Sequence, residues 1–134
     1  ARHVKLGPGG LSDVEWTIQL IQMRHGREVE ALRTSSTTDA IAAARDAGLL
    51  GASDAEILLN AWDLATRIRA GNTLATGRMS GVKLDVLPRD SAELSALAAI
   101  LGYGSGGLTA LEEDWLRAAR QARGVMERTF WEQQ

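Results

Sequence analysis

Apolar residues recur at helical spacing in five segments of the chain, which cover about residues 12–25, 38–47, 53–76, 91–101 and 109–131. Spacings of three and four place residues on one side of a helix. The last segment carries a single apolar stripe made of Leu111, Trp115, Ala118, Ala122 and Val125. The third segment has two distinct sides. Its apolar side consists of Leu58, Trp62, Ala65 and Ile68, and its polar side consists of Glu56, Asn60, Asp63 and Arg67. Trp62 and Trp115 stand mid-stripe, and we predict that both anchor the core.

The ends of these segments carry helix boundary signals. Three segments begin with a capping box, in which a Ser or Thr and a Glu three residues later satisfy free backbone N–H groups: Ser12 and Glu15, Ser53 and Glu56, Thr109 and Glu112. Gly26, Gly48 and Gly102 follow as terminators, and residues 77–90, with Gly81 and Pro88, are predicted to form a loop. Short connections between helices predict an all-α helical bundle of about five helices, whose topology stays open.

The first segment is ambiguous. Apolar and polar residues alternate from Val14 to Leu20, as in a half-buried strand. A polar stripe at helical spacing, made of Ser12, Glu15, Gln19 and Gln22, favours a helix instead. Apolar residues cover the other sides, so this helix is predicted to be buried on most sides.

Length and composition suit one soluble domain. The chain has 134 residues, of which 45% are hydrophobic and 24% charged, and its formal net charge is −2. That balance predicts no general attraction to nucleic acid. No stretch approaches the roughly 20 apolar residues that cross a membrane, and no cysteine is present for disulfides or thiolate metal sites. We find no signal peptide and expect a cytoplasmic protein.

The abrupt start at Ala1 suggests a domain cut from a longer protein. We therefore assign residues 1–134 to a single helical domain, in which residues 1–11 form a linker or turn from a preceding domain.

A glycine-rich loop, Lys5 to Gly10, leads into the first helix. Free N–H groups and the helix dipole make such a place a ready anion site. The loop nevertheless lacks the Gly-Lys-Ser/Thr of a Walker A motif, and Asp13 in the first turn competes with any phosphate. The alternative is a tight turn that lets the preceding segment pack closely on the helix.

Other candidate sites have simpler explanations. Asp13 and Glu15 point in different directions on a helix, and capping and the dipole account for them. His3 and His25, the two histidines, have no metal-ligand spacing. Arg117, Arg120 and Arg123 form a basic row that could hold phosphates or an acidic partner, but the acidic residues interspersed among them favour a solvated mixed-charge face.

The residues around this loop resemble a known family. Lys5, Gly9, Gly10 and the run Asp13-Val14-Glu15-Trp16, followed by Gln19, Gln22 and Arg24-His25, are similar to the segment just after the nucleotidyltransferase fold in glutamine synthetase adenylyltransferases. Further matches follow in order: 34–50, Ala65 to Arg69, Leu87-Pro88, Leu101-Gly102-Tyr103 and Val125 to Phe130. The resemblance covers essentially the whole chain.

This resemblance implies a helical companion domain, related to one shared with PII uridylyltransferases. In the family, a nucleotidyltransferase domain transfers AMP from ATP to a tyrosine of glutamine synthetase, a second domain removes it, and PII proteins and glutamine control both. The catalytic Gly-Ser-x-Asp-x-Asp motif is absent from this chain. No catalytic or metal-binding residue is therefore expected here, and ATP and magnesium belong to the longer enzyme.

The implied partners are the nucleotidyltransferase domain of the same polypeptide and, through it, glutamine synthetase and PII. We predict that Lys5, Gly9, Gly10 and Glu15 contribute to nucleotide binding at the seam with that domain, together with Gln19 and Gln22. The alternative function is a free-standing helical interaction module with no enzymatic parent.

Overall fold

In the computed structural model, which describes residues 1–76, 82–104 and 106–132, the regular structure is helical. The α-helices are α1 (Leu11–His25), α2 (Thr37–Asp46), α3 (Ala52–Thr76), α4 (Ser91–Ile100) and α5 (Leu108–Glu132), with short 3-10 turns η1 (Glu30–Leu32) and η2 (Val82–Asp85). The described residues hold no strand beyond one antiparallel bridge between His3 and Val86. The predicted all-α fold is confirmed.

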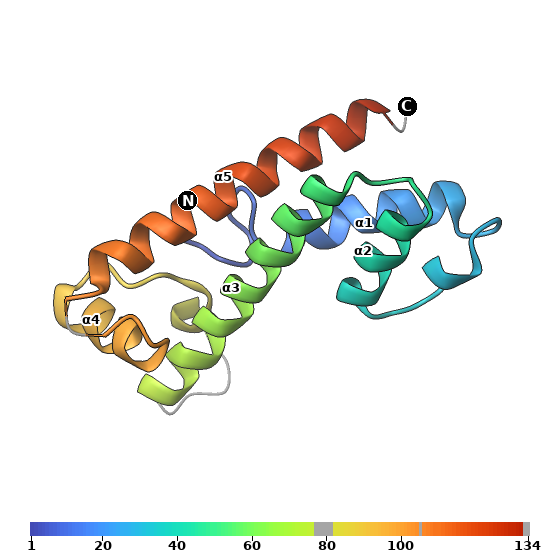
Figure 1. Ribbon diagram of the computed structural model, residues 1–134. Coiled ribbons are helices and arrows are strands. Elements are labelled where there is room, and N and C mark those ends of the chain that lie inside the picture. Colours follow the sequence, from blue (N-terminus) through green and yellow to red (C-terminus); the bar gives the residue numbers. More distant parts are fainter. Residues whose placement is uncertain (77–81, 105, 133–134) are drawn as a thin grey trace.

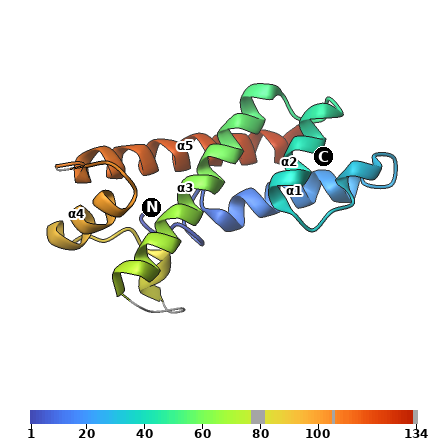
Figure 2. The same ribbon diagram turned by 60° about the horizontal axis from the view of Figure 1, so that its bottom comes forward.

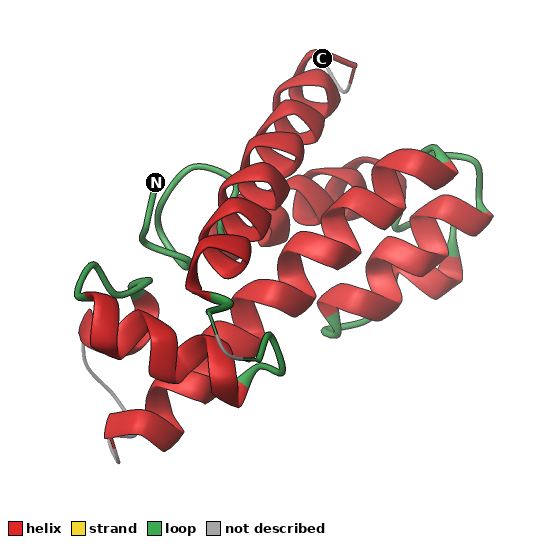
Figure 3. Cartoon of the chain, turned by 60° about the vertical axis from the view of Figure 1, so that its left-hand side comes forward, coloured by secondary structure: helices red, strands yellow, loops and turns green. Residues whose placement is uncertain are grey.

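The two long helices, α3 and α5, form the centre of the molecule and contact each other extensively (Figure 1). Helices α1 and α2 pack at one end of this pair, and α4 and η2 pack at the other end (Figure 2). The N-terminal segment runs beside α5 as a loop (Figure 3). Both ends of the molecule are thus built on the same two helices.

The predicted stripe of α5 faces the core. All five of its residues are buried, and Trp115 has 0% exposure. The prediction for Trp62 was wrong in degree, because this side chain is only half-buried and packs against the edge of the core. The core-facing line of α3 runs instead through Leu58, Ala61, Ala65 and Ile68, and Trp62 lies about 80° around the helix from the centre of this line.

The predicted N-caps were also wrong. Ser12, Ser53 and Thr109 are each the second residue of their helix. The first i to i−4 bonds run from Val14 to Gly10, from Ala55 to Gly51 and from Leu111 to Gly107, so a glycine precedes each helix. Glycine is an acceptable residue at this position. The structure assigns side-chain caps to two other helices, where Ser36 accepts from the Asp39 N–H and Asp90 from the Glu93 N–H.

Segment 12–25 is helical, so the strand alternative is excluded. The expectation that this helix is buried on most sides was wrong, because Trp16 is 44% exposed and Met23 is 82% exposed. Helix α1 packs on α2, α3 and α5, and the described chain covers the side that carries these two residues only in part.

Residues 1–10 are packed into the fold. Val4 is fully buried, and its N–H donates to the Asp85 carbonyl at 2.7 Å. The Leu87 N–H donates to the Arg2 carbonyl at 2.8 Å, and the Trp115 indole N–H donates to the Ala1 carbonyl at 2.9 Å. This segment therefore ties the region after η2 to α5. Residues 77–81 of the predicted loop 77–90, Gly81 included, lie outside the described residues.

Candidate functional site

The glycine-rich loop turns tightly against the start of α1, and its backbone donors are already used. The Gly10 N–H donates to the Gly7 carbonyl, the Leu11 N–H to the Val4 carbonyl and the Ser12 N–H to the Lys5 carbonyl, at 2.8–2.9 Å. A helix N-terminus binds anions through unpaired N–H groups. Because these three groups have partners, they are not available to an anion.

The glycines are needed for close packing. Gly9 has φ +74°, which favours glycine, and a Cβ on it would overlap the Ala119 carbonyl of α5. A Cβ on Gly10 would lie 2.6 Å from the Val4 carbonyl oxygen. The tight-turn interpretation therefore explains Gly9 through its contact with α5 and Gly10 through its contact with Val4.

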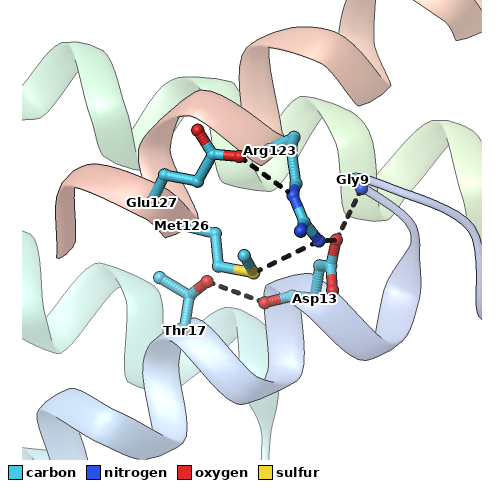
Figure 4. Close-up of polar contacts among 6 residues, drawn as sticks. All are labelled: Gly9, Asp13, Thr17, Arg123, Met126 and Glu127. Atoms are coloured by element: carbon cyan, nitrogen blue, oxygen red, sulfur yellow. Dashed lines mark hydrogen bonds and ion pairs between the residues drawn. The ribbon is translucent and has the colours of Figure 1, made fainter. Parts of the chain in front are cut away.

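Asp13 is the centre of this contact (Figure 4). Its carboxylate accepts a hydrogen bond from the Gly9 N–H at 2.7 Å and one from the Arg123 guanidinium at 2.9 Å. The hydrogen bond to Asp13 raises the pKa of Arg123, and Glu127 holds the same guanidinium at 3.2 Å. The Thr17 hydroxyl donates to the Asp13 carbonyl at 2.7 Å. Asp13 thus joins the loop, α1 and α5, and its carboxylate occupies the place where an anion would bind.

The predicted nucleotide-binding residues lie on the loop and on the first turns of α1. Lys5 is exposed on the loop, and Glu15 is half-buried on α1. Within the described chain, no hydrogen bond or ion pair engages either side chain. Both remain available to a partner from outside the chain, whereas Gly9 and Gly10 shape the loop.

The polar stripe of α1 divides into two kinds of residue. Gln19 is exposed. The Gln22 amide donates to the carbonyls of Leu32 and Thr34 at 2.8 and 2.9 Å, which holds the segment that follows α1. Gln22 therefore has a structural role.

A cavity of about 460 Å³ lies between the loop and α5. Its lining is mostly apolar, and its charged members are Arg120, Arg123 and Glu127. The basic row behaves as a mixed-charge face: Arg123 pairs with two carboxylates and Arg117 lies 2.5 Å from Asp114. Arg120 has no ion pair in the described part of the chain.

Asp114 also accepts a hydrogen bond from the Tyr103 hydroxyl at 2.7 Å. Burial and this hydrogen bond raise the pKa of Tyr103 to about 12. The turn before α5 is thereby fastened to the helix it precedes.

The histidines have local roles. His3 Nδ1 accepts a hydrogen bond from the Leu6 N–H, and His25 lies 4.0 Å from Glu28. Among the described residues, no group of three or more His, Cys, Asp or Glu side chains is placed to hold a metal ion. None of the described helices is both long and apolar enough to cross a membrane.

Sequence reasoning missed an aromatic patch where α1 and α5 meet, made of Trp16, Phe130 and Trp131. The rings of Trp16 and Phe130 stack at 5.8 Å, and Trp131 meets Phe130 edge-on at 5.8 Å. Their exposures are 44%, 37% and 72%. The available signal was that Trp16 lies among the polar residues Ser12, Glu15 and Gln19, and that Phe130-Trp131 follows the end of the buried stripe.

Comparison with known proteins identifies the family. The family model described as GlnD PII-uridylyltransferase matches residues 1–130. The chain belongs to this family. It is similar to proteins named bifunctional glutamine synthetase adenylyltransferase/adenylyl-removing enzyme, with 50% identity over 96% of the chain in Streptomyces coelicolor, 46% over 98% in Leifsonia xyli and 45% over 98% in Cutibacterium acnes. The resemblance seen in the sequence is confirmed.

The matched region is a small part of each of these relatives. The chain spans 12% of the length of the Streptomyces coelicolor protein and 13% of the other two.

Proposed function

We propose that this chain is a helical regulatory and structural domain of a glutamine synthetase adenylyltransferase/adenylyl-removing enzyme, which transfers AMP between ATP and glutamine synthetase in nitrogen regulation. The observation that carries the proposal is the identity of 45–50% with three such enzymes over nearly the whole chain. The all-α fold suits a companion to a catalytic domain.

The chemistry of AMP transfer is assigned to the rest of the enzyme. Nucleotidyl transfer uses carboxylate-held Mg²⁺ to neutralise the charge that develops on the phosphate. In this proposal, ATP and magnesium bind to a nucleotidyltransferase domain elsewhere in the cytoplasmic polypeptide, and that enzyme contacts glutamine synthetase and PII. The purified chain incubated with labelled ATP, Mg²⁺ and glutamine synthetase should transfer no label, and stoichiometric labelling would contradict this assignment.

At the seam with the catalytic domain, Lys5 and Glu15 are the side chains proposed to act near the nucleotide. Lys5 is exposed and Glu15 half-buried, and neither has a partner in the described residues. An ammonium on a flexible stem can reach a phosphate oxygen without help from the backbone. Gly9 contributes by allowing the loop to lie against α5, and Gly10 by allowing Val4 to approach the start of α1, so both shape the loop that carries Lys5.

The experiment is a lysine substitution in the full-length enzyme. Lys5→Ala should reduce AMP transfer to glutamine synthetase by about tenfold or more, the loss expected for one charge-assisted contact to a phosphate. The chain offers a matched control, since Lys83 is its other lysine and is also exposed. Lys83→Ala should leave activity unchanged.

Thermal unfolding of the same variants separates two explanations. If Lys5→Ala loses activity at an unchanged melting temperature, the result supports a role of Lys5 at the nucleotide. If the loss of activity parallels a fall in melting temperature, Lys5 serves only the packing of the turn. Full activity of Lys5→Ala would remove the nucleotide role.

A further inference from the structure

We propose that the aromatic patch of Trp16, Phe130 and Trp131 is the surface through which this chain docks onto another domain of the same longer polypeptide. The complementary surface on that domain is apolar at its centre and basic at its rim. The inference rests on the proposed function, since it requires that longer polypeptide. It names the contact that holds the domain in place, which is separate from the nucleotide role of Lys5.

The aromatic content of the patch is the first argument. The chain has four Trp, one Tyr and one Phe, so three of its six aromatic side chains lie in this patch. Trp131 is 72% exposed, and the stacked pair of Trp16 and Phe130 leaves 44% and 37% of those residues uncovered. Tryptophan is enriched among the residues that dominate binding energy at protein interfaces. Contiguous exposed apolar patches are often functional, whereas singly scattered exposed residues need no explanation.

The helix α1 extends the same side of the molecule. Trp16, Leu20 and Met23 are spaced four and three residues apart and therefore share one face. Met23 is 82% exposed, and Leu20 is half-buried. A flexible methionine beside rigid aromatic rings adapts to a partner surface.

An exposed carboxylate borders the patch, because Glu132 follows Trp131. In the described chain Glu132 has no ion pair, whereas the neighbouring Arg128 is held by Asp54 at 2.8 Å. Complementary charge at an interface rim favours the correct partner, so the docking surface should carry Arg or Lys around its apolar centre.

The size of the patch favours a domain of the same polypeptide over a second copy of the chain. Three partly exposed aromatic side chains offer on the order of 300 Å² of surface. A stable complex of separate chains buries about 800 Å² on each partner. Domains joined by one chain have effective concentrations in the millimolar range, so a small contact suffices. The chain spans 12–13% of the relatives' length, which leaves ample sequence for such a domain.

The test is hydroxyl-radical footprinting of the full-length enzyme and of the 134-residue chain, read by mass spectrometry. Trp16 and Trp131 should react severalfold more slowly in the enzyme than in the chain. Leu74, which is 74% exposed on α3, should react equally in both, and buried Trp115 should be protected in both.

Paired variants of the full-length enzyme complete the design. Trp131→Gln should restore the reactivity of Trp16 to that in the free chain, and Leu74→Gln should leave Trp16 protected. Equal reactivity of Trp16 and Trp131 in enzyme and chain would overturn the proposal. Protection that appears in the isolated chain as its concentration rises would identify a second copy as the occupant. Protection of Trp16 that persists in the Trp131→Gln enzyme would assign the shielding to other contacts. Either result would also overturn the proposal.

Failure of the proposed function has a different signature. If the enzyme shows the expected footprint but transfers no AMP, the docking proposal stands and the adenylyltransferase assignment is contradicted. If the enzyme transfers AMP while Trp16 and Trp131 are as reactive as in the free chain, the adenylyltransferase assignment stands and the docking proposal is contradicted.

Discussion

At the scale of single residues, the glycine-rich loop is determined by what lies across from it. Gly9 faces the Ala119 carbonyl on α5, and the Gly9 N–H is held by Asp13. The sequence shows a lysine, three glycines and a helix start, which is equally the pattern of an anion site. What decides between the two interpretations is a contact more than 100 residues away along the chain, from Asp13 to Arg123. Local pattern carries no information on such a contact.

Substitution at Gly9 measures this contact. Gly9→Ala combines an unfavourable positive φ with overlap on a backbone oxygen, so the free energy of unfolding should fall by about 3 kcal/mol or more. Gly48 is the matched control, because it has φ +76° and open space around its Cβ position. Gly48→Ala should cost only about 1–2 kcal/mol, the backbone component alone. Urea unfolding of both variants gives the difference, and equal losses would show that α5 yields to the added methyl group.

The tryptophans give a second residue-scale prediction. Trp115 has 0% exposure, Trp62 is half-buried and Trp131 is 72% exposed. Trp115→Ala should lower the free energy of unfolding by about 3–5 kcal/mol, Trp131→Ala should change it by about 0.5 kcal/mol or less, and Trp62→Ala should fall between them. A melting temperature for Trp115→Ala equal to that of the unmodified chain would contradict the position of this side chain.

At the scale of helices, the sequence predicted the existence of each helix well and its beginning less well. The stripe from Leu111 to Val125 was readable because i, i+3 and i+4 spacing is a local property. Three starts were predicted one residue too late. The residues that precede these helices are Gly10, Gly51 and Gly107, and a nearby Ser or Thr followed by Glu is a more conspicuous start signal than a glycine. The aromatic patch was missed because a tryptophan on a mostly apolar helix is usually buried.

The turn into α5 allows a direct test of one helix junction. Tyr103 is the single tyrosine of the chain, so phenolate absorbance during an alkaline titration reports it alone. Its pKa should be about 12 instead of the usual 10.0, chiefly because of burial. Asp114→Asn should bring the pKa down while leaving it above 10.0, since burial, the largest cause, remains. A titration midpoint near 10.0 in the folded chain would show that the hydroxyl is solvated.

The same shift predicts a pH dependence of stability. Between pH 10.0 and about 12 the folded chain keeps the Tyr103 proton while the unfolded chain loses it. Stability therefore falls through this interval as the pH rises. Tyr103→Phe should show a smaller fall in the free energy of unfolding over the same range.

At the scale of the whole molecule, the N-terminal segment behaves as part of the domain. Val4 is fully buried, and its neighbours Arg2 and Ala1 bond to the Leu87 and Trp115 regions. Arg2 also reaches Glu112 at 2.7 Å on α5. Nothing in the composition of residues 1–10 distinguishes a packed segment from a linker, because the partners lie 80 or more residues away.

Two apolar residues of this segment test its packing. Val4→Ala should lower the free energy of unfolding by about 2 kcal/mol, because two buried methyl groups are lost and a cavity remains. Leu6→Ala is the matched control, since Leu6 is 69% exposed and should change stability by about 0.5 kcal/mol or less. Guanidinium unfolding of both variants is the measurement. Two equally small effects would mean that the segment is detached in solution.

The sharing of α3 and α5 by both ends of the molecule has a consequence for cooperativity. Each helix is 25 residues long and contacts elements at both ends of the fold, so neither end can melt while leaving the other with a complete core. Thermal unfolding should then be a single transition with equal calorimetric and van't Hoff enthalpies. Backbone amides in the middle of α3 and α5 should exchange with solvent only when the entire domain opens, whereas those of η1 should exchange through local opening. If the amides of α4 exchange early while those of α3 remain protected, the domain consists instead of two independent folding units.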